Sequence, residues 1–108
     1  MKTMSVWISY DLGITGDYNG LFQWLDTHKG IECVNNTALI KEFSYKEDFF
    51  SELRTDLEKY IKLERSDRIY VIYKDNDDRI KGKFLVGNRK MAPWTGYAML
   101  EEMTEDLV

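Results

Sequence analysis

The chain has 108 residues and a formal net charge of −4, with 19 acidic and 15 basic side chains. This length is typical of one domain with one hydrophobic core, and the negative charge argues against polyanion binding over the whole surface. The single cysteine, Cys33, cannot form an intrachain disulfide, and neither a signal region nor a long apolar run is present, so we expect a cytoplasmic protein without a membrane span.

The first half of the chain predicts a strand, a helix and two further strands. Apolar residues alternate with others in residues 4–12, which is the period of a strand with one buried face. A helix follows with Asp17 as its N-cap and His28 near its end, and this role suits Asp17 better than metal binding. Residues 31–43 predict two short strands around a turn or bulge at Asn35 and Asn36.

The second half predicts one more helix and two more strands. Ser44 and Glu47 have the spacing of a capping box ahead of an apolar helical stripe that runs from Phe49 to Ile61. Residues 67–74 form the next expected strand, and residues 83–87 a short last one after a charged turn.

The order of these elements predicts an α+β fold of the ferredoxin-like β-α-β-β-α-β type, with an extra short C-terminal strand and two helices on one face of an antiparallel sheet. We expect a single domain over residues 1–108, with a core at about 4–87 and a C-terminal extension at 88–108. The other sheet face would display Trp7, Tyr70, Tyr73 and the apolar run 84–86. Because so much apolar surface is unusual on a small sheet exposed to water, we expect a homodimer through this face.

A first strand that ends in Tyr10, Asp11 and Leu12 ("YDL"), this layout, and a strand "DRIYVIY" followed by a short strand carry a resemblance over residues 4–87. The chain resembles the small CRISPR-associated adaptation endonucleases and the virulence-associated protein D toxins. The resemblance implies that Asp11 of both subunits holds a divalent metal, Mg²⁺ or Mn²⁺, that activates water against a phosphodiester. It also implies a second possibility, since some members of this superfamily act as structural dimers.

The role of Asp11 has two possible interpretations on chemical grounds. Hard cations prefer carboxylate oxygens, and two Asp11 residues that face each other across a dimer axis would supply them. Asp11 can equally end the strand and begin a turn, as aspartate often does. Both readings stay open at this stage.

The last notable stretch of the sequence combines basic and aromatic residues. Residues 79–90 contain five basic residues and no acid, and Trp94 and Tyr97 follow. Of these, Arg89, Lys90 and Trp94 are the candidates for nucleic-acid binding, because cations can hold a phosphate backbone while an aromatic ring stacks on a base. In the alternative reading, Trp94 packs into the core or a dimer seam, and the lysines of the last strand protect an exposed sheet edge.

The sequence therefore leaves two candidate functions. The first is a dimeric metal-dependent endoribonuclease or other nuclease that acts on RNA or DNA through Asp11. The second is a dimeric interaction module without catalysis, which binds a protein partner or a sister subunit through its C-terminal segment, with Trp94 and Tyr97 as anchors.

Overall fold

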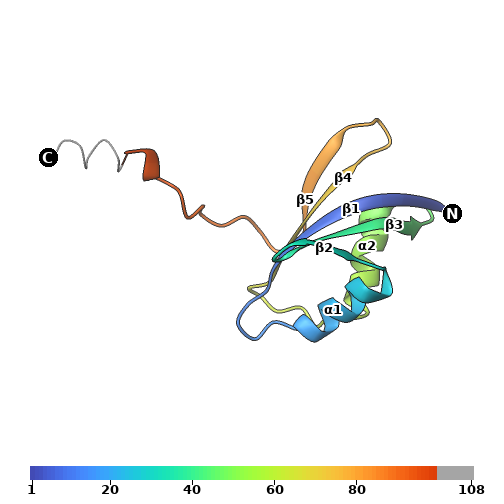
Figure 1. Cartoon of the computed structure of the whole chain (residues 1–108), viewed down its shortest axis with the longest axis horizontal. Coiled ribbons are helices and arrows are strands. Elements are labelled where there is room, and N and C mark those ends of the chain that lie inside the picture. Colours follow the sequence, from blue (N-terminus) through green and yellow to red (C-terminus); the bar gives the residue numbers. More distant parts are fainter. Residues whose placement is uncertain (100–108) are drawn as a thin grey trace, which may run out of the picture.

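The computed structural model describes residues 1–99, so residues 100–108 of the predicted C-terminal extension lie outside the described part. Five strands form one antiparallel sheet in the order β2-β3-β1-β4-β5, and two helices pack beside it (Figure 1). The elements are β1 (Lys2–Asp11), α1 (Tyr18–Thr27), β2 (Ile31–Val34), β3 (Thr37–Tyr45), α2 (Phe49–Glu58), β4 (Arg68–Lys74) and β5 (Ile80–Val86). This arrangement confirms the predicted α+β class with an antiparallel sheet.

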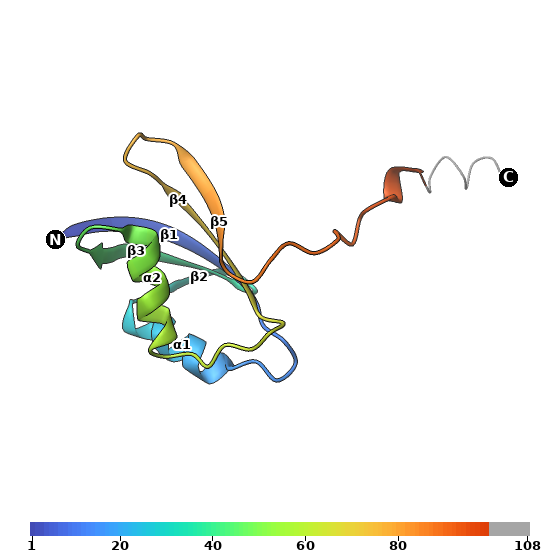
Figure 2. The same cartoon turned by 180° about the vertical axis from the view of Figure 1, so that it is seen from behind.

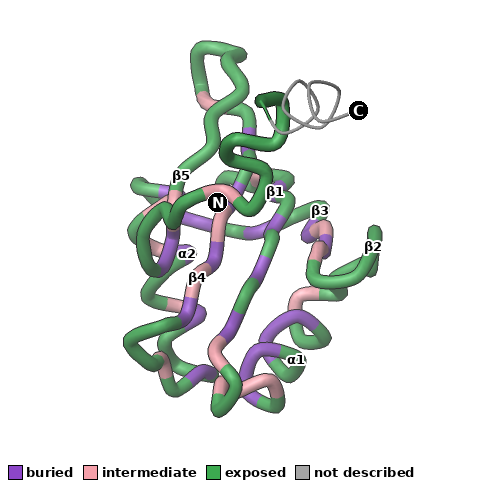
Figure 3. Tube along the Cα trace, turned by 90° about the vertical axis from the view of Figure 1, so that its left-hand side faces the viewer, coloured by how far each residue is buried: buried purple, intermediate pink, exposed green. Residues whose placement is uncertain are grey.

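Strand β1 lies in the middle of the sheet and carries the centre of the core. Val6 is opposite Ile40 of β3 and Tyr73 of β4, and all three side chains are buried. The alternation of buried and exposed residues along β1 is visible in Figure 3. This strand was predicted from its period, although it begins two residues earlier than expected.

Both helices cover the same face of the sheet (Figures 1 and 2). Helix α1 begins as predicted, because the Asp17 carboxylate accepts a 2.9 Å hydrogen bond from the backbone N–H of Gly20, and it ends at the C-cap His28. Within residues 1–99, no helix has both the length and the apolar character that a membrane crossing needs.

The predicted capping box before α2 is wrong. Strand β3 continues to Tyr45, whose side chain is buried, so Ser44 belongs to the strand and the helix begins only at Phe49. The Glu52 carboxylate instead accepts hydrogen bonds from three successive backbone N–H groups, at residues 46–48. The start of the helix is thus stabilised by a carboxylate in its own first turn.

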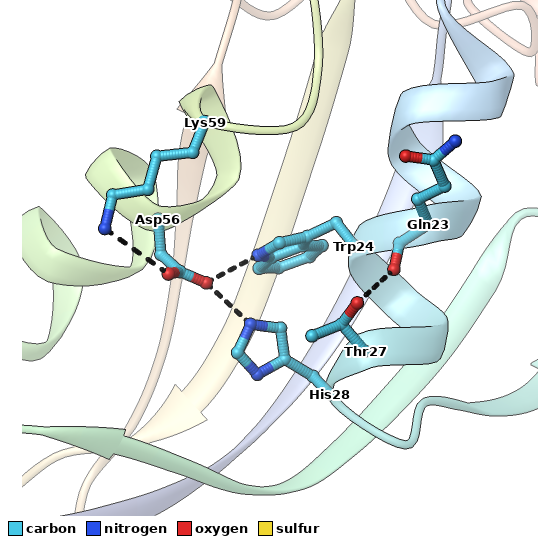
Figure 4. A network of polar contacts seen from close by, with 6 residues as sticks. All are labelled: Gln23, Trp24, Thr27, His28, Asp56 and Lys59. Atoms are coloured by element: carbon cyan, nitrogen blue, oxygen red, sulfur yellow. Dashed lines mark hydrogen bonds and ion pairs between the residues drawn. The ribbon is translucent and has the colours of Figure 1, made fainter.

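A polar network joins the two helices (Figure 4). Asp56 Oδ2 on α2 accepts a 2.9 Å hydrogen bond from Nε1 of the fully buried Trp24, and it lies 2.6 Å from His28 Nε2 at the end of α1. Satisfying the indole N–H in this way removes the cost of burying an unpaired donor.

The sheet face away from the helices, which we call the open face, differs in part from the prediction. Trp7 and Ile72 are about two-fifths exposed there, and Tyr70 forms an edge-to-face pair with Phe84 at a centroid distance of 4.9 Å. Tyr73, in contrast, is buried on the helix-covered face, because residues three apart in a strand point to opposite sides.

The apolar run 84–86 is likewise divided between the two faces. The register of β4 and β5 shifts between Ile69 and Tyr70, which leaves Leu85 as an extra residue in β5. This bulge lets both Leu85 and Val86 enter the core, and only Phe84 remains on the open face. The open face is therefore less apolar than the sequence predicted.

Candidate functional site

Asp11, the predicted catalytic and metal-binding residue, ends β1 directly opposite Arg68 of β4. Its Oδ2 accepts hydrogen bonds from Nε of Arg68 at 3.2 Å and from Nη2 at 2.5 Å. The Asp11 side chain is 59% exposed and that of Arg68 28%. The sequence gives no sign of this ion pair, because Arg68 lies 57 residues further along the chain.

The loop after Asp11 is fixed by a buried carboxylate. Asp67 is 1% exposed, and its two oxygens accept the backbone N–H groups of Gly13 and Glu64 at 2.9 and 2.8 Å. A side chain at Gly13 would place its Cβ 2.3 Å from Ser66 Oγ. The sequence pattern placed Asp67 at the start of a strand and gave no sign of these two hydrogen bonds. They fix the path of the chain after Asp11.

A shallow hollow of about 380 Å³ surrounds this ion pair on the open face. Asp11 and Arg68 line it together with the aromatic pair of Tyr70 and Phe84. Within residues 1–99 there is no group of three or more His, Cys, Asp or Glu side chains that could hold a metal ion. One chain therefore brings a carboxylate, a guanidinium and two aromatic rings to this hollow.

The predicted nucleic-acid residues Arg89, Lys90 and Trp94 follow β5 in the C-terminal segment, by which we mean residues 88–99. This segment leaves the sheet at the same end as Asp11, because Val86 pairs with Ile69, the neighbour of Arg68. Arg89 and Lys90 are exposed and lie outside helix and strand. Within residues 1–99, no hydrogen bond or ion pair joins either of them to Asp11, which pairs with Arg68 instead.

The C-terminal segment extends away from the domain (Figures 1 and 2). Its backbone hydrogen bonds at residues 92–99 are made within the segment itself. Four large apolar side chains are 64–84% exposed, namely Met91, Trp94, Tyr97 and Met99. The alternative prediction that Trp94 packs into the core of its own chain is therefore wrong.

A second hollow on the open face is larger and more apolar. This open-face groove has a volume of about 900 Å³ and is lined by side chains from β1, β4 and β5, including Trp7, Ile72 and Ile80. Ile80 is 77% exposed. An exposed apolar surface of this kind is typical of a surface that another polypeptide covers.

No protein-family model, curated protein or solved structure matches this chain. A function for this protein must therefore be inferred from the residues of the candidate site. They offer an apolar groove, an apolar C-terminal segment, and a polar hollow with one carboxylate per chain.

Proposed function

We propose that the protein is a homodimeric interaction module with a ferredoxin-like fold, in which the C-terminal segment of each subunit docks into the open-face groove of the other. The exposure of Trp94, at 72%, is the observation that carries this proposal. Aromatic anchors of this kind contribute most of the binding energy when they fill a pocket on a partner. The strand order β2-β3-β1-β4-β5 supports the ferredoxin-like topology, with β5 as the added strand.

A second copy is the favoured occupant because this one chain carries both complementary surfaces. Reciprocal exchange would cover both grooves and both segments about one twofold axis, and such closed symmetry is the commonest form of soluble oligomer.

Sedimentation equilibrium of the full chain tests the proposal. Trp94→Ala should raise the dissociation constant of the dimer by about 30-fold or more, as expected for loss of a hot-spot side chain of about 2 kcal/mol. Ile14→Ala is the matched control, because Ile14 is fully exposed and lies outside the groove and the segment. A wild-type monomer, or a Trp94→Ala dimer as tight as the control, would contradict the proposal.

A dimeric metal-dependent nuclease is the second candidate, and the pairing of Asp11 with Arg68 in an exposed hollow favours it. A guanidinium binds phosphate oxygens in bidentate fashion, and a carboxylate can hold Mg²⁺ or Mn²⁺ beside them. Arg89 and Lys90 leave the sheet at this same end and could hold an RNA or DNA backbone. The dimer would have to bring the second Asp11 to the same metal.

Cleavage of end-labelled single-stranded RNA, duplex RNA and duplex DNA with either metal tests this candidate. Asp11→Asn should abolish cleavage, whereas Asp77→Asn, in the exposed β4–β5 turn, should leave it unchanged. Equal cleavage by both variants, or none by the wild type, would exclude Asp11 as a catalytic residue.

A further inference from the structure

Neither of the two candidate functions involves a groove that lies on the helix-covered side of the molecule. It has a volume of about 450 Å³ and lies between α1 and the hairpin of β2 and β3. Tyr10 and Phe22 supply aromatic surface, Asp26 and Glu32 supply carboxylates, and the hairpin turn supplies Asn36. No lysine, arginine or histidine lines this α1–hairpin groove.

The two carboxylates come from opposite walls of the groove. Asp26 lies in the last turn of α1 and Glu32 in β2, and both are exposed. Within residues 1–99, neither side chain forms an ion pair, although six such pairs occur elsewhere in that part of the chain. The groove therefore carries two negative charges that its own chain does not neutralise.

Tyr10 gives the groove an aromatic wall and a neutral hydroxyl group. Its side chain is 9% exposed and packs edge-to-face on Phe22 at a centroid distance of 6.2 Å. Burial, together with the nearby Tyr18 and Glu32, raises the pKa of the Tyr10 hydroxyl, so that this group stays protonated. Within residues 1–99 no buried side-chain oxygen or nitrogen lacks a hydrogen-bond partner, so the Tyr10 hydroxyl is not left unpaired inside the protein.

We propose that the α1–hairpin groove binds an organic cation, namely a guanidinium or a primary ammonium group on an alkyl chain. The carboxylates of Asp26 and Glu32 would neutralise the cation, and the ring of Phe22, half exposed, would take the alkyl chain or the cation face. An inorganic metal ion fits less well, because the described residues hold no group of three metal-binding side chains and the groove far exceeds one ion in volume. This site lies on the opposite side of the sheet from the open-face groove and does not depend on dimerisation.

Titration of the isotope-labelled full chain, followed by amide chemical shifts in NMR spectra, tests the proposal. The probes are butylguanidinium and butylammonium, and butylurea is a neutral control of similar shape. The cations should shift the amides of Phe22, Gly30 and Asn36, which line or flank the groove. Asp26→Asn and Glu32→Gln should each weaken binding about three- to tenfold, whereas Asp77→Asn removes an equal charge elsewhere and should not.

A second comparison identifies the source of the cation. A blocked Gly-Arg-Gly peptide that binds more tightly than butylguanidinium, and more tightly than its citrulline counterpart, would indicate a basic side chain of a polypeptide. Equal or weaker binding of the peptide would indicate a free small molecule. Shifts that butylurea reproduces, or that Asp77→Asn weakens as much as Glu32→Gln, would overturn the proposal, as would the absence of any shift at these amides.

Discussion

The polar contact between the two helices makes a quantitative prediction for Asp56→Ala. The substitution removes the acceptor of Nε1 of Trp24, whose side chain is fully buried. A buried donor that loses a charged acceptor costs about 2 to 3 kcal/mol of unfolding free energy. Loss of the His28 contact adds little to this loss of unfolding free energy, because the His28 side chain is 22% exposed and can form a hydrogen bond with water instead.

Urea denaturation followed by far-UV circular dichroism measures the loss. Glu58→Ala is the matched control on the same helix, since Glu58 pairs with Arg54 at a surface where both side chains are nearly half exposed, and such pairs contribute about 0.3 to 0.5 kcal/mol. Asp56→Asn keeps an oxygen that can accept from the indole, so it should lose less stability than Asp56→Ala. A loss in Asp56→Ala no greater than in Glu58→Ala would refute the reasoning.

Two other predictions concern stability and pH. The pKa of Glu52 is lowered mainly by hydrogen bonds from the backbone N–H groups of Lys46 and Glu47, so its contribution to stability is complete above its ordinary pKa of 4.5 and is lost as the pH falls through the lowered value. Glu52→Gln should therefore lose less stability than the wild type between neutral and acid pH, and urea midpoints across that range check this, with Glu58→Gln as the control. Gly20→Ala should destabilise the protein by about 1 to 3 kcal/mol although alanine favours helices, because the new Cβ would lie 2.3 Å from the backbone oxygen of Tyr60. Urea denaturation measures this loss, and Ser51→Ala, at an exposed position of α2, should cost nothing in the same measurement. A stabilised Gly20→Ala would contradict the contact.

The parts of the fold that the sequence predicted correctly are set by local patterns. The period of Val6, Ile8 and Tyr10 identifies β1, because alternate side chains of a strand share one face. Asp17 and His28 mark the ends of α1, since caps depend on groups within one helical turn. These signals do not need a partner from elsewhere in the chain.

The features that the sequence missed depend on pairing between distant segments. Arg68 meets Asp11 only because β4 pairs with β1 in one particular register. The bulge in β5 that buries Leu85 is a property of two strands together, and no pattern within β5 reveals it. For the same reason, the candidate site residue Trp94 could be identified from sequence, whereas its exposure required the structure.

Reciprocal docking of the C-terminal segment is the central claim, and mixing two variants tests it most directly. Trp94→Ala removes the anchor from the segment, and Trp7→Ala removes a wall of the open-face groove, so each variant alone should sediment as a weakened dimer. A mixed dimer of the two has one intact pair, formed by the segment of the Trp7→Ala subunit and the groove of the Trp94→Ala subunit. The account predicts that the mixture associates more tightly than either variant alone in sedimentation equilibrium. A mixture that is no tighter than its components would contradict the exchange of segments between subunits.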